Sequence, residues 1–509
     1  MDPASLQVLI ARLTGVAEEM GAVLRRAAYS PNIKERADCS AALFTPEGDL
    51  LVQAEHIPVH LGSMPASVRA AIDAFGRTGV APGQQVILND PFAGGTHLND
   101  VTLVAPCWVD GRLVGWAANR AHHADVGGIA PGSMPPDALE IDEEGVRIPP
   151  LLLDDDSVAM LVGASRTPDE RRGDLDAQVG ANAIGVERLA AFAGASLVAV
   201  TDYGERRMRA ALAAAPDGAW SFSDVIDSVG PRPDQQHPVD VACTVTIDGE
   251  TITFDFTGSG AQRPGNVNAV EAVTVSAVAF AARSVLDPTL PANGGAFRPV
   301  TVVAPHGSIV AAQPPAAVGA GNVEVSQRVA DVCLGALAQA FPDRVGAAGQ
   351  GTMNNTLIGG EAWVYYETVA GGQGGRPWAP GMSGVHTAMT NTKNTPIEAF
   401  ERAYPMRVRR YRLRRASGGE GRHPGGDGIE RDIEMLEDCT VSLITERRIS
   451  QPWGLAGGEP GAPGANWLVP GSVESRAEPL LDKCTVAVRA GDVLRMLTPG
   501  GGGWGPRAD

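Results

Sequence analysis

Histidine and cysteine are both scarce in this chain, which has nine histidines and six cysteines among 509 residues. The cysteines lie far apart, and no two of them form a Cys-x-x-Cys pair. This spacing argues against a zinc knuckle or a redox dithiol. We therefore expect six buried thiols in a reducing compartment.

Positive charge is also in short supply, because 41 Lys and Arg residues face 59 Asp and Glu residues, giving a formal net charge of −18. Nucleic-acid binding depends on Lys and Arg displacing counterions from phosphates, so this balance excludes a general affinity for nucleic acids. One basic run, MRVRRYRLRR at 406–415, alternates its charges with apolar residues. That alternation predicts an exposed strand face.

Long apolar runs are missing as well. No window approaches the ~18 uninterrupted apolar residues of a membrane helix, and no signal-like segment opens the chain. With 44% hydrophobic and 20% charged residues, the composition is typical of a soluble globular protein, which we place in the cytoplasm. A chain of this length is expected to form two or three domains.

Helical and strand periodicities alternate along the chain. Residues 1–28 have apolar residues at helical spacing behind Asp2 and Pro3, a suitable N-cap and first helical position. Period-two runs broken by Glu-Gly-Asp or Asp-Gly then predict hairpins, with a helix between them after Pro65. Further helices are predicted within 157–215, at 266–286 and at 322–341, and another hairpin at 243–258.

After about residue 345 the composition shifts toward Gly, Pro and alternating strands. The whole pattern predicts an α+β fold, multi-layered and mixed, with antiparallel β-hairpins, packed helices and a β-rich C-terminal third. We assign an N-terminal α+β domain to 1–215, a central hairpin and helix region to 216–345, and a β-rich C-terminal domain to 346–509.

A third of the few histidines gather in one predicted hairpin. His97 and Asp100 precede its first strand, and His122 ends its second strand. Because a hairpin folds its two ends together, these three residues can meet in space and form a two-His, one-carboxylate site. Nitrogen and oxygen donors without sulfur suit Zn²⁺, Mn²⁺ or Fe²⁺ with open coordination positions. The alternative is hydrogen-bonded structural histidines.

His123 and Asp125 follow directly, and they cannot all join one ligand set with the others. Neighbouring residues on a strand point to opposite faces, so only one of His122 and His123 would face the ion. His56 and His60 form a second candidate pair, but Pro58 between them forbids a regular metal-binding helix face. These two are either a loop that approaches the site or structural residues.

Other motifs exclude familiar chemistries. GGGGWG at 500–505 lacks the Lys-Ser or Lys-Thr of a phosphate loop, so we expect a flexible or tightly packed strand ending there. GAGNVE at 319–324 precedes a predicted helix, where backbone N–H groups could hold an anion, but without a Walker lysine ATP hydrolysis by this chain alone is not expected. No Gly-x-Ser-x-Gly elbow is present. Several Asn residues, including Asn322 and Asn355, sit in turns and either form those turns or line a polar cleft.

Several long stretches resemble the hydantoinase B/oxoprolinase family, in family order from near residue 29 to the C-terminus. They are YSPNIKERADCSAALFTPEGDLLVQAEHIPVHLGSMP, NDPFAGGTHLNDVTLVAP, HHADVGG, DFTGSGAQRPGNVN, TNTKNTPIEAFE and TPGGGGWG. The family includes the B subunits of ATP-dependent N-methylhydantoinases, part of 5-oxoprolinases, a caprolactamase subunit, and the α subunits of acetone and acetophenone carboxylases. The chain is somewhat short for the carboxylase subunits, which favours the amidohydrolase branch.

The resemblance implies a division of labour. A separate A-type subunit, or an N-terminal domain in 5-oxoprolinase, would use ATP to phosphorylate the oxygen of a hydantoin, 5-oxoproline or lactam. The B-type chain would then open the ring at a site with one divalent metal, as part of a hetero-oligomer. The family's metal ligands match His97, Asp100 and His122.

Roles for the surrounding residues follow from this mechanism. His123 or Asp125 would orient a ligand or move protons. Arg120, Lys34 and Arg36 are candidates for binding phosphate, and His60 for contacting substrate; for each basic residue the alternative is a surface ion pair. Two further hypotheses stay open: carboxylation of a phosphorylated ketone with CO₂ from bicarbonate, and a catalytically silent partner of the A-type chain.

Overall fold

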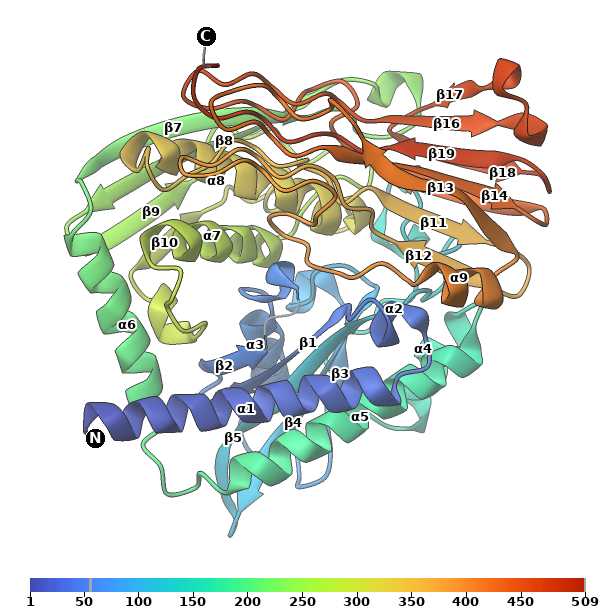
Figure 1. Ribbon diagram of the computed structural model, residues 1–509. Coiled ribbons are helices and arrows are strands. Elements are labelled where there is room, and N and C mark those ends of the chain that lie inside the picture. The colour runs from blue at the N-terminus through green and yellow to red at the C-terminus, as the bar shows by residue number, and fades with distance from the viewer. Residues whose placement is uncertain (55–56, 508–509) are drawn as a thin grey trace.

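A six-stranded sheet forms the N-terminal layer of the computed structural model, which describes residues 1–54 and 57–507. Its strand order is β2-β1-β5-β4-β3-β6. The strands are β1 (Cys39–Phe44), β2 (Leu50–Ala54), β3 (Val86–Leu88), β4 (Asp100–Val109), β5 (Arg112–His122) and β6 (Leu151–Leu152). Helices α1 (Pro3–Ala27) and α5 (Pro168–Ala190) cover one face, and α3 (Met64–Phe75) packs on the other (Figure 1).

The long helix α1 forms where the sequence predicts it. Asp2 caps it by accepting a hydrogen bond from the Ser5 backbone N–H, and Pro3 occupies its first turn. Its apolar stripe, which includes Leu13 and Met20, is buried against the sheet and α5. Short helices α2 (Pro31–Lys34) and α4 (Asp155–Ala164) flank this layer.

The central layer is a four-stranded sheet with helices on one side. Its order is β10-β9-β8-β7, built from β7 (Gly218–Ile226), β8 (Val239–Asp248), β9 (Thr251–Asp255) and β10 (Val300–Val303). Helix α6 (Val198–Ala213) leads into it, and α7 (Glu271–Leu286) and α8 (Ser326–Ala340) lie between it and the N-terminal layer. The predicted helices at 266–286 and 322–341 are thus present, but α7 begins five residues later, and a π-helical turn, Gly321–Val325, precedes α8.

Two antiparallel sheets make up the C-terminal layer. One has the order β12-β11-β15-β18 and the other β13-β14-β19-β16-β17. They are built from β11 (Asn355–Gly359), β12 (Val364–Glu367), β13 (Met406–Arg414), β14 (Gly428–Met435), β15 (Cys439–Ile444), β16 (Ala465–Val469), β17 (Glu478–Leu480), β18 (Lys483–Val488) and β19 (Val493–Leu497), with helix α9 (Ile397–Ala403) beside them. Apolar residues of both sheets share one core cluster, so the sheets pack face to face.

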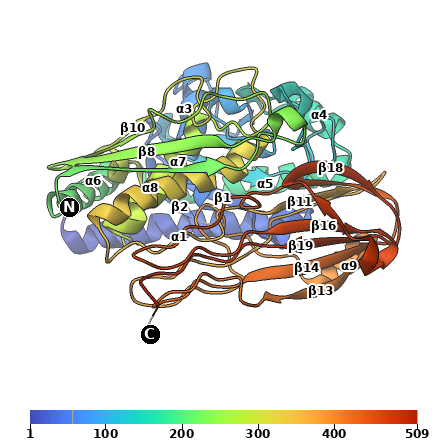
Figure 2. The ribbon, with the colours of Figure 1, turned by 90° about the horizontal axis from the view of Figure 1, so that it is seen from above.

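Beyond these sheets, glycine-rich segments run side by side in extended conformation (Figure 2). Gly501 illustrates the packing: its N–H donates to the Gly426 carbonyl, and a Cβ added to it would lie 2.2 Å from the Gln373 carbonyl oxygen. Backbones approach this closely only where side chains are absent. Of the two expectations for GGGGWG, the structure has the tightly packed strand ending.

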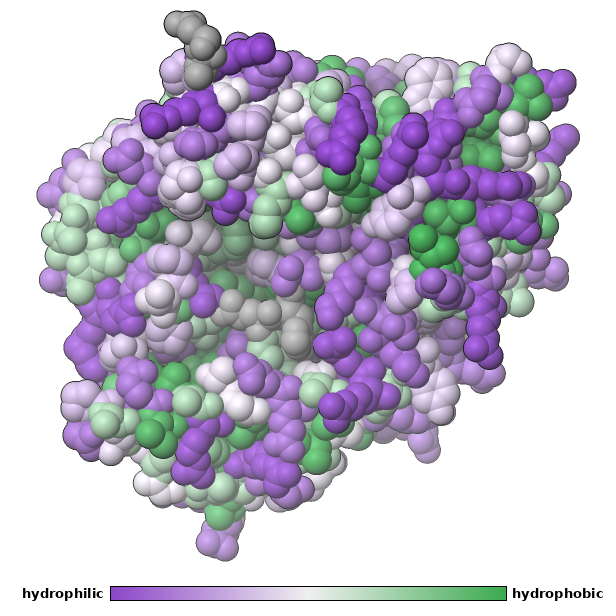
Figure 3. Space-filling view, in the orientation of Figure 1, coloured by the Kyte–Doolittle hydropathy of each residue, from purple (hydrophilic) through white to green (hydrophobic). Residues whose placement is uncertain are grey.

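The basic strand β13 is an exposed strand face, as predicted. Arg410 and Arg412 both pair with Glu430 of the neighbouring strand β14, and Arg409 pairs with Glu434. In Figure 3, hydrophilic side chains, interrupted by small apolar patches, cover the visible surface of the C-terminal layer. The arginines therefore have carboxylate partners within the protein.

The whole molecule is an α+β structure whose largest apolar core cluster includes residues from Ile57 to Ile444, across all three predicted segments. All six cysteines are buried free thiols, as expected. Among residues 1–54 and 57–507, no helix combines the length and apolarity that a membrane span needs.

Candidate metal centre

The three predicted ligands meet at the open end of the β4–β5 hairpin. Asp100, the first residue of β4, pairs in antiparallel register with His122, the last residue of β5. His97 lies in the turn before β4. One ligand atom from each side chain lies within 4.8 Å of the others. The hairpin thus brings together His97, Asp100 and His122 as its two ends close.

One carboxylate oxygen of Asp100 is the centre of this cluster. His97 Nε2 lies 3.1 Å from Asp100 Oδ1, and His122 Nδ1 lies 3.3 Å from the same oxygen. Thr96 Oγ1 donates to Asp100 Oδ2 at 2.6 Å and so fixes the carboxylate. All three candidate ligands are buried.

The electrostatics of these groups suit a divalent cation. Burial alone would raise the pKa of Asp100, but the neighbouring His97 and His60 and a hydrogen bond with His122 hold it well below its usual range. Burial lowers the pKa of His122, so its imidazole is neutral at pH 7. His97 Nδ1 and His122 Nε2 are buried without a hydrogen-bond partner in the described part of the chain. A carboxylate and two imidazoles with unused nitrogens are a donor set that fits Zn²⁺, Mn²⁺ or Fe²⁺.

His60 lies beside the cluster, on the short 3₁₀ turn Pro58–His60. Its Nε2 is 3.4 Å from Asp100 Oδ2, and its Nδ1 is 2.9 Å from Ser40 Oγ on β1. His60, Asp100 and His122 line a cavity of about 20 Å³, with residues from distant segments on its other walls: Asp38, Ile57, Val59, Asn322, Val323, Met353, Tyr366, Thr368, Thr390 and Thr392. This volume accommodates about one water molecule. His56, the other member of the predicted pair, lies outside the described residues.

Tyr366 of β12 packs directly on a candidate ligand. Its ring stacks on His122, with ring centroids 4.5 Å apart and planes 18° apart. The Arg36 guanidinium lies 4.7 Å from the Tyr366 ring centroid and donates to the Tyr366 carbonyl and to Thr368 Oγ1. The C-terminal segment is therefore part of the wall of a site whose candidate ligands lie in the N-terminal layer.

His123 and Asp125 lie away from this cavity. The side chain of His123 points to the opposite sheet face, where its Nε2 lies 2.9 Å from Gln178 Oε1 of α5. Asp125 pairs with Arg166 at 2.9 Å and accepts hydrogen bonds from backbone N–H groups of 127 and 132. Strand alternation separates His122 from His123, as predicted, and the side chain of His123 contacts Gln178 and not the candidate metal ligands.

The predicted phosphate-binding residues occupy three different environments. Arg120 is fully buried and donates to the hydroxyls of Thr102, Ser63 and Ser67, and burial lowers its pKa to about 10. Arg36 is also buried and has the contacts described above. Lys34 is exposed on α2. Neither arginine is the surface ion pair considered as the alternative, and both guanidinium groups are already engaged by protein oxygens.

Sequence reasoning missed the wall opposite the ligands. Tyr366 is too far along the chain from the hairpin for any spacing argument. Asn322 is one of the asparagines expected either to form turns or to line a polar cleft, and it lines the cavity. The GAGNVE motif at 319–324 does contain a residue that lines the cavity, Asn322, but the anion-binding interpretation of this motif depended on a regular helix start. The structure instead has a π-helical turn there, a feature often found at functional sites.

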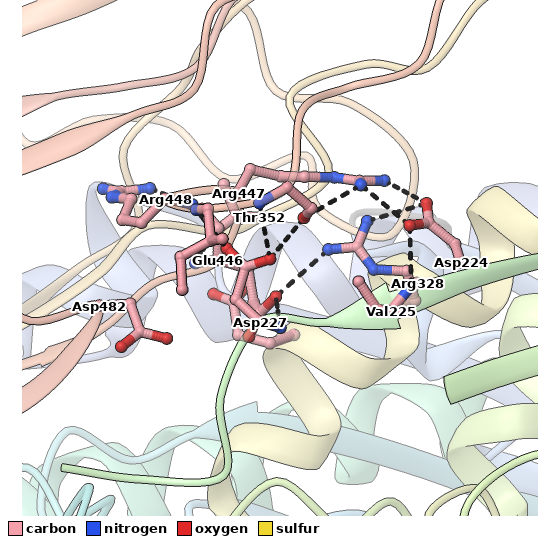
Figure 4. A network of polar contacts seen from close by, with 12 residues as sticks. Asp224, Val225, Asp227, Arg328, Thr352, Glu446, Arg447, Arg448 and Asp482 are labelled. Carbon is pink, nitrogen blue, oxygen red and sulfur yellow. Dashed lines mark hydrogen bonds and ion pairs between the residues drawn. The ribbon is translucent and has the colours of Figure 1, made fainter. Parts of the chain in front are cut away.

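A buried charge network supports this wall (Figure 4). Arg328 of α8 pairs with Asp331 and Glu446, and Lys483 lies 2.5 Å from Glu446 Oε1. Arg447 bridges Asp224 of β7 and Asp331 of α8. The network therefore ties the central layer to the C-terminal sheets immediately beside the π-helical turn.

Comparisons with known proteins agree with this architecture. The family model for hydantoinase B/oxoprolinase matches residues 2–507. The chain is 38% identical to 5-oxoprolinase 1 of Arabidopsis thaliana, over 99% of this chain but only 42% of that protein. It is 30% identical to the putative B-type subunit of a D-/L-hydantoinase from a Pseudomonas species, over 99% of this chain and 90% of the relative.

A solved structure has the same fold. The ATP-dependent caprolactamase from Pseudomonas jessenii superposes with a TM-score of 0.91 at 27% identity, over 99% of this chain and 91% of that one. This likeness and the full-length family match cover all three layers and the hairpin that holds the candidate ligands. The chain belongs to the hydantoinase B/oxoprolinase family.

Proposed function

We propose that this chain is the metal-dependent B-type subunit of an ATP-dependent cyclic amidohydrolase. It would complete the ring opening of a hydantoin, 5-oxoproline or lactam whose oxygen an A-type partner has phosphorylated. The observation that carries the proposal is the buried cluster of His97, Asp100 and His122 beside a cavity, with imidazole nitrogens that have no hydrogen-bond partner in the part of the chain that the structure describes. Relatives named as a hydantoinase component and as 5-oxoprolinases support the substrate class.

The same comparisons support an ATP-binding partner chain. The chain spans about two fifths of the length of the 5-oxoprolinases that it matches, but nine tenths of the B-type hydantoinase chain. We infer that a separate ATP-binding chain supplies what the remainder of a 5-oxoprolinase contains. Phosphorylation converts the poorly reactive amide oxygen into a leaving group, so the two chains act in sequence and form a hetero-oligomer.

In this proposal the residues around the cavity have different roles. A divalent ion held by His97, Asp100 and His122 would polarise water and lower its pKa toward neutrality. Asp100 stays ionised and balances the ion's charge, while Thr96 holds it in place. His60 lines the cavity with Nε2 3.4 Å from Asp100 Oδ2 and Nδ1 2.9 Å from Ser40 Oγ, so it holds the Asp100 carboxylate from the side opposite His97 and His122 and is placed to contact substrate.

The first test is metal content. We expect about one equivalent of Zn, Mn or Fe in protein purified without chelator, and loss of that metal in His97→Ala and Asp100→Ala variants that stay folded by circular dichroism. His306→Ala, an exposed histidine, is the matched control and should keep the metal. A metal-free parent, or variants that keep the ion, would contradict the proposed site.

The second test is activity of the complex reconstituted with an A-type chain. ATP-dependent opening of a cyclic amide without bicarbonate is expected, with a loss of at least about 100-fold in His97→Ala. Bicarbonate-dependent consumption of a ketone would instead identify a carboxylase. Full activity in His97→Ala would leave this chain a silent assembly partner.

A further inference from the structure

Asn322 is a buried residue whose amide oxygen is left without a hydrogen bond. The residue is 3% exposed, and Oδ1 has no hydrogen-bond partner among residues 1–54 and 57–507. It lines the same small cavity as His60, Asp100 and His122. A buried carbonyl oxygen left unpaired is destabilising, and a hydrogen-bond donor bound in the cavity would offset that cost.

The backbone around Asn322 is built to hold this orientation. The π-helical turn Gly321–Val325 replaces the regular start of α8, and the Gly321 N–H donates to the Asn266 carbonyl. A Cβ on Gly321 would lie 1.8 Å from the Asn268 carbonyl oxygen, so only glycine allows this close approach. Ser326 Oγ donates to the Asn322 carbonyl at 2.6 Å. The turn is thereby fixed on both sides of Asn322.

Glu324, two residues after Asn322, anchors the turn to the opposite wall of the cavity. Glu324 Oε1 accepts hydrogen bonds from the Met353 N–H and from Asn355 Nδ2, at 3.2 and 2.9 Å. Asn355 Oδ1 in turn accepts from the Tyr366 hydroxyl at 2.9 Å, and the Tyr366 ring stacks on His122. Asn322 is therefore held in a fixed position relative to a candidate metal ligand.

The size of the cavity indicates what the amide binds. A volume of about 20 Å³ accommodates about one water molecule, which needs two to four polar partners. Asn322 Oδ1 can only accept a hydrogen bond, and a water O–H is a donor of the right size. We propose that Asn322 binds and orients the water that attacks the activated substrate, in addition to the three metal ligands. This inference rests on the proposed function.

In this role Asn322 Oδ1 accepts a hydrogen bond from one O–H of the water and so fixes the orientation of the water molecule. An oxygen lone pair then stays directed at the carbon that it will attack. Asn322 contributes to orientation, because a neutral amide cannot itself take up the proton.

The test replaces Asn322 with Leu, which has nearly the same shape without the polar atoms. In the metal-loaded complex we expect kcat for ring opening to fall about 100-fold, since a misplaced attacking group loses roughly that much rate. The metal content of Asn322→Leu should equal that of the parent. Asn391→Leu, at an exposed asparagine, is the control and should match the parent in both measurements.

A second readout does not depend on catalysis. In Mn²⁺-loaded protein, ¹⁷O relaxation gives the residence time of water at the centre, which Asn322→Leu should shorten about fivefold, as loss of one hydrogen bond predicts. Asn322→Ala, which adds no apolar group, should behave alike and replaces the Leu variant if that one does not fold. If a variant keeps its metal and its water residence time and kcat equal those of the parent, the inference is overturned.

Two other outcomes would also overturn it. Loss of the metal in Asn322→Leu would make the amide a ligand of the ion. A rate loss confined to substrates with a free ring N–H, with N-methyl analogues unaffected, would show that Asn322 contacts the substrate and not the water. In both cases the parent would still bind metal and open cyclic amides, so the proposed function would stand.

Discussion

The ring of Tyr366 stacks on the imidazole of His122 at 4.5 Å, although the two residues lie in different layers of the fold. The stack fixes the plane of a candidate ligand that has no hydrogen-bond partner at Nε2 in the described structure. It also makes the C-terminal segment part of the site. Residues that orient metal ligands commonly change metal affinity when they are replaced.

We therefore expect Tyr366→Leu to weaken metal binding about 10- to 100-fold. Tyr366→Phe keeps the ring and loses only the hydroxyl bond to Asn355, so its affinity should lie much closer to that of the parent. Titration of the apoprotein with Mn²⁺, followed by electron paramagnetic resonance, measures the metal affinity of each variant. Equal affinities of the Leu variant and the parent would show that the stack does not orient His122.

The stability of the protein should depend on pH through His123. Burial, with a further contribution from the Arg171 charge, lowers the pKa of His123 to about 4, below the usual 6.5. Between these values the unfolded chain binds a proton that the folded protein does not. Stability that is present above pH 6.5 is therefore lost as the pH falls toward 4.

Replacing His123 with Gln should make the melting temperature less sensitive to pH over this range. Differential scanning calorimetry from pH 7.5 to pH 4.5 compares the slopes of parent and variant. His306→Gln, at an exposed position, should keep the parent's slope. A His123→Gln slope equal to that of the parent would mean that this histidine is protonated in the folded state.

Adding a methyl group to the packed glycine segments should destabilise the fold. In Gly501→Ala the new Cβ would lie 2.2 Å from the Gln373 carbonyl oxygen, so backbone must move. We expect a loss of about 1–3 kcal/mol or more, as for an overpacked core. Gly163→Ala is the matched control, because it lies in α4 with nothing within 4 Å and should be neutral or slightly stabilising.

The buried charge network should be sensitive to loss of a single cation. Lys483→Met would remove the ammonium group that pairs with buried Asp482 and would leave buried Glu446 with Arg328 as its remaining ion-pair partner. Breaking a buried pair in this way costs about 3–5 kcal/mol. Arg77→Met, in an exposed pair with Glu47, should cost less than about 1 kcal/mol. Denaturant titration of both variants gives the comparison.

The sequence by itself determined the features that depend on neighbouring residues. Periodicity and turn chemistry predicted the α+β class, the hairpins and the long first helix. The antiparallel return of one hairpin was enough to place His97, Asp100 and His122 together, because strand pairing fixes the spacing of its ends. Alternation along the strand also showed that His122 and His123 face opposite ways.

Only the tertiary structure decided which of these two histidines lies beside Asp100 and the cavity, since that depends on where α5 and its Gln178 pack. It also buried Arg36 and Arg120 among protein oxygens and paired Asp125 with Arg166. Asn322 and Tyr366 reach the cavity from segments about 200 residues or more beyond the hairpin ligands. Such contacts arise from the packing of whole layers, and no local pattern encodes which distant side chains that packing brings together.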